Sequence, residues 1–262
     1  MDAFRKNILL FATILATLLL PLAALAASTP NAPSTLIVES SSTFDQNNYP
    51  AKPVDALAGN ITQLTLTAIS QTRAWQGYWG NVSGTITLDD ASNYTFYNWS
   101  AAEPRGYIYA TLVSAGVPSW LNVQCFDKAN NASLFDQYYG INPDDYDNVT
   151  NTYNTTLDAL PAPQTVYIVN NSFTTCPATT IWQSDAYQPG NFVNYLMYDS
   201  SAAQGNQSWV FGTVIENKNI GNKTDIPCYN GQLCDFQLLV GENGHGTNTG
   251  VTPYYVWVDL SG

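Results

Sequence analysis

The residues that could carry catalysis in this chain are few. His245 is the only histidine, and a Ser–His–Asp triad would have to use it. No G-x-S-x-G nucleophile elbow accompanies it. A glycosidase needs only two carboxylates about 5–10 Å apart, and Glu216, Asp235 and Glu242 fall near the ends of expected strands. The sequence therefore assigns no catalytic residue and predicts that the protein is not an enzyme, with a carboxylate-dependent hydrolase as an alternative.

An acidic run at residues 144–148 could hold calcium, because hard cations take several oxygens from one loop. The EF-hand order fails, since its fifth position would be occupied by Val149. The start of a helix explains the same carboxylates, with Asn142 as its cap and Pro143 at its first position. We therefore predict no cofactor, and keep Ca²⁺ as an alternative.

Three aromatic residues, Trp75, Tyr78 and Trp79, stand close together among glycines. If they are exposed, their flat apolar faces could stack on a sugar ring. Core packing at one end of a sandwich explains the same residues. This run is the candidate ligand-binding site of the sequence, with carbohydrate as the ligand class.

The clearest pattern is the N-x-S/T acceptor for N-linked sugar. It occurs ten times, whereas random order would give about four. Polar composition alone is the simpler explanation, and a surface carrying covalent N-glycans is the functional one. The acceptors are Asn60, Asn81, Asn93, Asn98, Asn131, Asn148, Asn154, Asn170, Asn206 and Asn222.

The N-terminus predicts export. A short basic start precedes an unbroken apolar run at residues 8–20, and small residues follow. Residues 1–26 thus form a signal peptide or, if uncleaved, a membrane anchor. Residues 27–44 are rich in Ser, Thr, Pro and Asn and are expected to form a tether or arm, with an apolar island at residues 36–38.

The cysteines agree with an extracellular destination. Their number is even, as in disulfide-bonded exported proteins. A zinc site fits poorly, since the chain has a single histidine. By proximity along the chain alone, we expect the pairs Cys125–Cys176 and Cys228–Cys234.

The charge balance excludes one class of partner. The chain has 8 Lys and Arg against 20 Asp and Glu, with a net charge of −12. Such a surface repels phosphate backbones, so nucleic-acid binding is not expected. After residue 27 no segment is long and apolar enough to span a membrane, so membrane contact is expected only through an uncleaved N-terminal segment.

Period-2 alternation of apolar residues with threonine indicates half-buried antiparallel strands. Proline, glycine and asparagine separate the strands repeatedly, which is typical of a sandwich. We predict an all-β fold, an antiparallel Ig-like or jelly-roll-like β-sandwich with at most one or two short helices. It would occupy residues 45–262, as one domain or as two packed subdomains that meet near 157–164. The expected strands are residues 64–68, 82–88, 107–113, 120–126, 165–169, 192–198, 209–215, 236–240 and 254–260.

Two stretches of the chain carry a family likeness. Residues 72–84, together with 86–91, and residues 234–244 resemble uncharacterised exported proteins of archaea that are thought to sit on the cell surface. The resemblance covers about one eighth of the chain. It implies a cell-surface role and carries over no site residue.

The sequence thus favours a secreted structural protein of the cell surface, an envelope component or the subunit of an extracellular filament. Its partners would be other copies of itself or other envelope proteins. The arm, residues 27–44, could complete a neighbour's sheet, because edge strands have unpaired N–H and C=O groups. A carbohydrate-binding module is the alternative.

Overall fold

The fold is seen in a computed structural model that describes residues 29–43, 53–67, 70–99, 105–113, 119–182, 192–202, 209–215, 226–243 and 251–261. The predicted export signal, residues 1–26, lies outside the described residues. All strands in the described residues fall between Trp75 and Ser261, within the expected domain.

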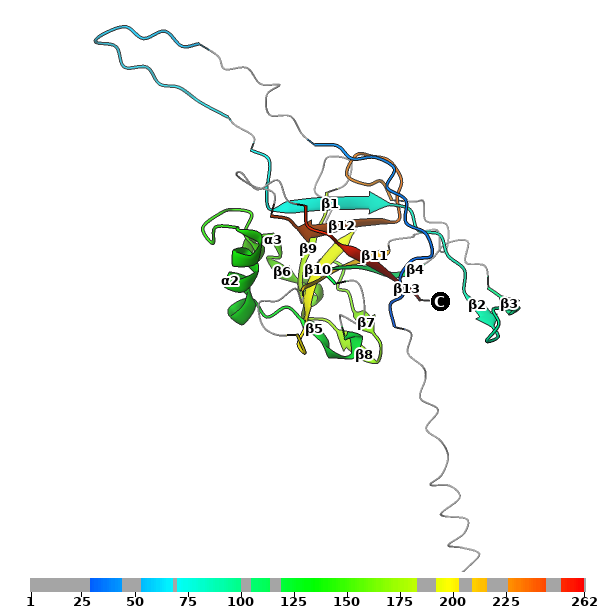
Figure 1. The fold of residues 1–262 in the computed structure, drawn as a ribbon. Coiled ribbons are helices and arrows are strands. Elements are labelled where there is room, and N and C mark those ends of the chain that lie inside the picture. Colours follow the sequence, from blue (N-terminus) through cyan, green and yellow to red (C-terminus); the bar gives the residue numbers. More distant parts are fainter. Residues whose placement is uncertain are drawn as a thin grey trace, which may run out of the picture.

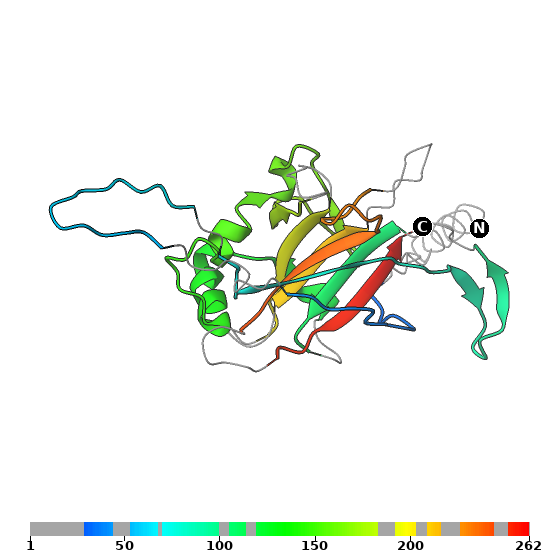
Figure 2. The same cartoon turned by 90° about the horizontal axis from the view of Figure 1, so that it is seen from above.

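A seven-stranded antiparallel sheet forms the centre of the molecule (Figure 2). At its middle, nearly every residue of β10 (Val193–Asp199) and β11 (Trp209–Ile215) is buried, because both faces of the sheet are covered. β5 (Val123–Cys125) and β9 (Pro177–Thr180) lie end to end along the same edge of β10. The full order is β13 (Tyr255–Ser261), β4 (Arg105–Thr111), β11, β10, β9 and β6 (Thr155–Thr156), with β5 beside β10.

A first core fills one face of this sheet. There β1 (Trp75–Gly80) and β12 (Phe236–Gly241) form a separate two-stranded ribbon, and α2 (Lys128–Tyr139) and α3 (Val149–Thr152) lie beside it (Figure 1). Burial of apolar surface stabilises this layer against the sheet. Its buried members include Phe135, Tyr139, Trp209, Phe211, Leu238 and Val240.

A second core fills the opposite face. It is covered by the hairpin of β7 (Val166–Ile168) and β8 (Asn171–Phe173) and by the 3-10 turn η3 (Leu157–Ala159). A further 3-10 turn, η2 (Trp120–Asn122), leads into β5. The buried members include Tyr109, Leu157, Val166, Ile168, Tyr195 and Met197.

The hairpin of β2 (Thr87–Asp89) and β3 (Thr95–Asn98) pairs with neither layer. It projects from the body at the end opposite α2 (Figure 2). Every residue of both strands is exposed.

The predicted all-β antiparallel fold is confirmed, and so is its limit of one or two short helices. In the described residues the α-helices are α2, with 12 residues, and α3, with 4. The strands expected at 107–113, 165–169, 192–198, 209–215, 236–240 and 254–260 are all present within a residue or two.

Four local predictions are wrong in whole or in part. The strand expected at 82–88 is present only from Thr87, and the strand expected at 120–126 begins with the 3-10 turn η2 and is a strand only at Val123–Cys125.

The helix expected to start at Asn142 is a series of turns, and α3 starts at Val149 instead, capped by the Asn148 side chain. The strand expected at 64–68 is irregular and exposed over its described part, residues 64–67. In that stretch the alternating pattern is correct for a strand, but no described strand pairs with it.

Candidate interaction surface

The β1–β12 ribbon stands on its edge above the central sheet. Buried side chains of the sheet bind the inner edge of β12 in place of a neighbouring strand. Asn194 Oδ1 accepts from Leu239 N at 2.8 Å, and Asn194 Nδ2 and Thr213 Oγ1 each donate to Gln237 O at 2.9 Å. The backbone groups of β12 are thereby satisfied without a strand partner on that side. β1 is left on the outer side of the ribbon (Figure 1).

The outer edge of β1 turns its backbone groups away from β12, and one of them, Gly77 O, accepts from the Gln76 side-chain Nε2 at 2.8 Å. Glu242 N donates to Ala74 O at 2.8 Å, which makes these two residues a hydrogen-bonded pair. Bonded and non-bonded pairs alternate in an antiparallel ladder, so Gln76 and Tyr78 turn their backbone groups toward β12. The N–H and C=O groups of Trp75, Gly77 and Trp79 therefore point outward.

The structure does not bring the three predicted ligand-binding rings together. Trp75 packs on Phe135 with ring centroids 5.7 Å apart, and its Nε1 donates to Asp147 O at 2.7 Å. Tyr78 and Trp79 are exposed, but as consecutive strand residues they lie on opposite faces of β1. Partial burial, with the nearby charge of Glu242, raises the pKa of Tyr78. Trp75 is thus a packing residue, and Tyr78 and Trp79 form no single flat platform.

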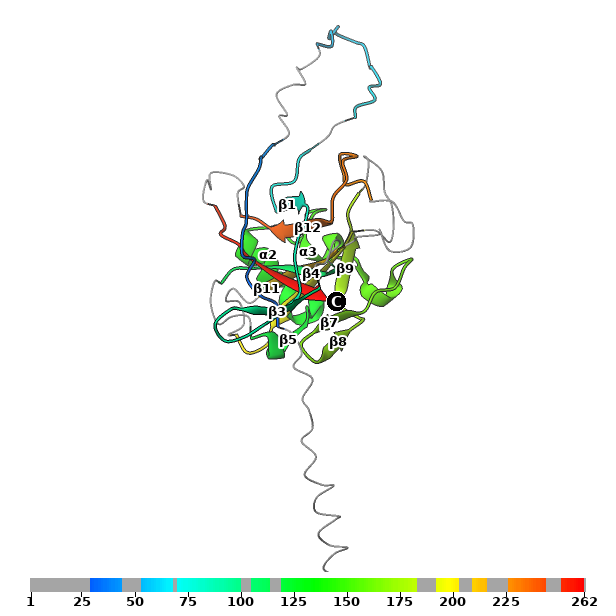
Figure 3. The same cartoon turned by 90° about the vertical axis from the view of Figure 1, so that its right-hand side faces the viewer.

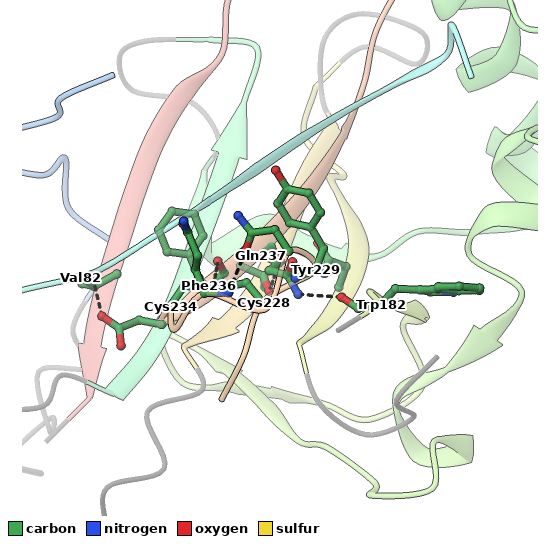
Figure 4. The surroundings of a disulfide bond; sticks show 12 residues. Val82, Trp182, Cys228, Tyr229, Cys234, Phe236 and Gln237 are labelled. Carbon is green, nitrogen blue, oxygen red and sulfur yellow. Dashed lines mark hydrogen bonds between the residues drawn. A yellow bond between two sulfur atoms is a disulfide. The ribbon is translucent and has the colours of Figure 1, made fainter. Parts of the chain in front are cut away.

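A disulfide-closed loop supports the ribbon from the side. Cys228 and Cys234 close a turn in which Gly231 adopts a φ of +80°, a conformation that favours glycine. The side chain of Gln237 ties this loop to the chain, since its Oε1 accepts from Tyr229 N at 2.9 Å and its Nε2 donates to Trp182 O at 3.2 Å (Figure 4). The Tyr229 ring then meets the Trp79 ring edge-on at 5.8 Å.

Two extended segments place large apolar side chains in solvent. Residues 53–67 leave the body beyond β1 and return to it (Figure 3). Ile61 is fully exposed and Leu66 is 84% exposed. Leu36, Ile37 and Val38 of the predicted arm are also exposed, although Asn31 forms a two-way backbone bridge with Val258 of β13. The described residues cover neither segment.

The β2–β3 hairpin is a third exposed apolar element. Leu88 lies opposite Tyr97 in the hairpin register. The rings of Tyr97 and Trp99 pack at 4.7 Å, while Phe96 is 84% exposed. An isolated two-stranded hairpin is only marginally stable in water, so these aromatic faces are candidates for contact with another molecule.

Most of the predicted sugar acceptors are on the surface. Asn131 and Asn148 are buried, and Asn148 uses its amide to bond Asn151 N at 2.8 Å and Pro143 O at 2.6 Å. Asn206 and Asn222 lie outside the described residues. The exposed acceptors are Asn60, Asn81, Asn93, Asn98, Asn154 and Asn170, each in or beside a turn or irregular segment.

Both disulfides join the expected cysteines. Cys125 and Cys176 lie with their Cα atoms 4.5 Å apart, and Cys228 and Cys234 with theirs 5.9 Å apart. The first disulfide joins β5 to the turn before β9, the two strands that share one edge of β10. Disulfides of this kind indicate a non-reducing environment.

The candidate acids do not form a glycosidase pair in the described residues. Asp235 directly precedes β12 and Glu242 directly follows it, so about 23 Å of extended chain separates their Cα atoms. Asp235 Oδ2 accepts from Val82 N at 2.7 Å, as drawn in Figure 4. Glu216 and His245 lie outside the described residues.

Two carboxylates of the acidic run at residues 144–148 accept hydrogen bonds from the protein itself. Asp147 Oδ2 accepts from Thr72 Oγ1 at 2.5 Å, and Asp145 Oδ2 accepts from Asn142 N at 3.3 Å. Over the part of the chain that the structure describes, no three His, Cys, Asp or Glu residues gather as a metal site would require.

Among the described helices, none has the length and apolar character needed to cross a membrane. Comparisons with protein-family models, with curated proteins and with solved structures found no match to this chain.

Proposed function

We propose that this protein is a secreted, glycosylated structural component of the cell surface that assembles with copies of itself, as an envelope component or a filament subunit. The observation that carries the proposal is the set of extended apolar segments outside both cores. Residues 36–38, residues 61–66 and the β2–β3 hairpin expose side chains that a solitary soluble protein would bury or replace. Association between copies removes this surface from water.

Two further features support an extracellular role. The paired cysteines suit a non-reducing compartment. The exposed acceptors stand at turns, where sugar attachment meets no steric obstacle. Together with the expected export signal and the resemblance to exported archaeal proteins, they favour the outside of the cell.

Native material tests the proposal directly. Electron microscopy and sedimentation should show polymers or a lattice, and intact mass after dissociation should exceed the mass of the bare chain by whole glycans. A native protein that is monomeric at every concentration and carries no sugar would overturn it.

Deleting residues 27–44 tests the role of the arm. Residues 36–38 are exposed, but the deletion also removes the backbone bridge between Asn31 and Val258, so circular dichroism and thermal unfolding first establish that the shortened protein is folded. If the arm completes a neighbour's sheet, its assembly should be lost. Unchanged assembly would show that the arm is dispensable.

Carbohydrate binding is the second candidate, because Tyr78 and Trp79 remain exposed on β1. Each ring could stack separately on a sugar. A glycan array with the native protein and with a Trp79→Ala variant decides the matter. No bound glycan, or unchanged binding by the variant, would exclude the role.

A further inference from the structure

We infer that the outer edge of β1 is the acceptor for residues 61–67 of a second copy of this chain, which add to the ribbon as a third strand. This inference rests on the proposed self-assembly and names the contact that would produce it.

The acceptor edge has none of the usual protection against strand addition. Natural edge strands are blunted by charged residues, prolines or bulges. β1 has no charged residue and no proline, and its register with β12 is continuous over its whole length. In the described residues only β12 pairs with it, so the outward backbone groups of Trp75, Gly77 and Trp79 have no strand partner. The exposed Gln76 side chain donates from Nε2 to Gly77 O at 2.8 Å, and an added strand would take the place of that bond.

Residues 61–67 have the properties of the missing strand. The segment contains no charge, no glycine and no proline. Leu64 and Leu66 alternate with Thr65 and Thr67, a pattern typical of a half-buried strand. All these residues are exposed and belong to no strand in this structure. Its extended length of about 23 Å is close to the length of about 20 Å for β1.

The chain's own path keeps this segment away from its own β1. Just before β1, Thr72 Oγ1 donates to Asp147 Oδ2 at 2.5 Å, and Ala74 O already accepts from Glu242 N. These bonds fix the direction in which the chain enters the ribbon. Residues 53–67 extend outward, away from β1 (Figure 1). The edge of a second copy is then the partner that the segment can reach.

The side chains of the two segments are complementary. Trp75, Gly77 and Trp79 alternate on one face of β1, and a Cβ built on Gly77 would meet nothing within 4 Å. An incoming leucine fits beside Gly77 between the two tryptophans, and aromatic–aliphatic pairs stabilise neighbouring strands. A one-way contact of this kind joins copies head to tail, whereas a reciprocal exchange closes a two-fold dimer.

Cysteine pairing between chains of different mass tests the contact. One chain carries Gly77→Cys and a tag, and the untagged chain carries a single cysteine at position 63, 64, 65 or 66. The four native cysteines are all paired in disulfides, so the engineered thiols react with each other. Mild oxidation should give a mixed dimer whose yield alternates with position, because only one face of a strand meets Gly77. Asp55→Cys, exposed in the same excursion, is the control.

A yield no higher than that of the Asp55→Cys control at all four positions would overturn the inference. So would exclusive cross-linking within one chain when Thr65→Cys and Gly77→Cys are combined. If the native protein still polymerises in either case, the proposed function stands and only this contact is wrong. If the protein never associates, both the proposed self-assembly and this contact are wrong.

A second variant pair blocks the edge. Gly77→Pro removes an outward N–H that β12 does not use, so β1 should stay in the ribbon while strand addition is lost. Gly77→Ala keeps the N–H and places its Cβ in open space, so it should assemble like the native chain. Equal assembly of the two variants would contradict the inference.

Discussion

Gly212 lies at the middle of the central sheet, between two tyrosines on the neighbouring strands. It is opposite Tyr195 on β10 and Tyr109 on β4. A Cβ at this position would collide with ring carbons of Tyr195 and lie 2.8 Å from its hydroxyl oxygen. The Tyr195 ring is fully buried and cannot swing into solvent. Glycine is therefore required here by packing.

Gly212→Ala should destabilise the protein by about 1–3 kcal/mol, the usual range for overpacking a core. Denaturant unfolding measures it as a lower midpoint with an unchanged slope. Gly77→Ala is the matched control, since its added methyl meets nothing within 4 Å. A loss of equal size in both variants would mean that packing against Tyr195 is not the cause.

Asp136 is a buried carboxylate in α2 whose Oδ1 accepts from Val149 N at 3.0 Å. Burial is the main cause that raises its pKa, and the charges of Asp145 and Asp147 add to it. In the unfolded chain the pKa of aspartate is about 3.9. Between that value and the higher folded value the folded state binds more protons, so the free energy of unfolding falls as pH rises through this window.

Asp136→Asn should abolish this pH dependence, because the amide oxygen still accepts from Val149 N and carries no charge. At pH 7 we expect the variant to have a higher melting temperature than the native chain. The difference should shrink as pH falls toward about 4. Exposed Asp55→Asn serves as the control, and an equal response in the two variants would contradict the assignment.

At the scale of elements, Asn194 decides how the β1–β12 ribbon is attached. Asn194→Ala leaves Leu239 N–H buried without its acceptor, which costs about 1–3 kcal/mol. Hydrogen exchange at the Leu239 amide should accelerate more than at the neighbouring Val240, whose backbone groups face β1. Asn151→Ala, which removes an exposed side-chain bond, should leave both rates unchanged. Uniform acceleration along β12 would show that the ribbon unfolds as a whole instead.

The strands of the central sheet could be predicted because their own residues specify them. β11 and β10 are near-continuous apolar runs, as strands covered on both faces must be. α2 could not be predicted from its interior, since Asn130, Asn131 and Ser133 are weak helix formers. Its ends carried usable signals: Asp127 caps the first turn, and Gly140 closes the last with a φ of +65°.

The candidate interaction surface was only partly predictable, because it depends on contacts between residues that are far apart in the sequence. Trp75, Tyr78 and Trp79 were visible in the sequence as a cluster. Their separation into one core residue and two exposed ones depends on strand alternation and on α2, which supplies Phe135. The upright ribbon depends on Asn194 and Gln237, which are 43 residues apart. Contacts of that range leave no local pattern.

At the scale of the whole molecule, alternation of apolar and polar residues indicates that a segment can form a strand. It does not indicate that a neighbouring strand is present to pair with it. Residues 64–67 alternate leucine with threonine as a half-buried strand does, yet they are exposed. Whether a segment is buried depends on how the whole chain folds around it, and the described chain does not bury residues 64–67. The pairing of the cysteines was predictable from their order in the sequence, because each disulfide joins two consecutive cysteines.

The two disulfides should differ in their effect on the stability of the whole molecule. Each restricts the unfolded chain in proportion to the logarithm of the loop that it closes. Cys125–Cys176 spans 51 residues and Cys228–Cys234 spans 6, which predicts losses of about 4 and about 2 kcal/mol on removal. Replacing each pair by alanine and measuring unfolding midpoints tests the order. Only the first pair also ties β5 to the turn that leads into β9. An equal or reversed order would therefore mean that the small loop, through Tyr229 and Trp79, stabilises the ribbon more than chain entropy requires.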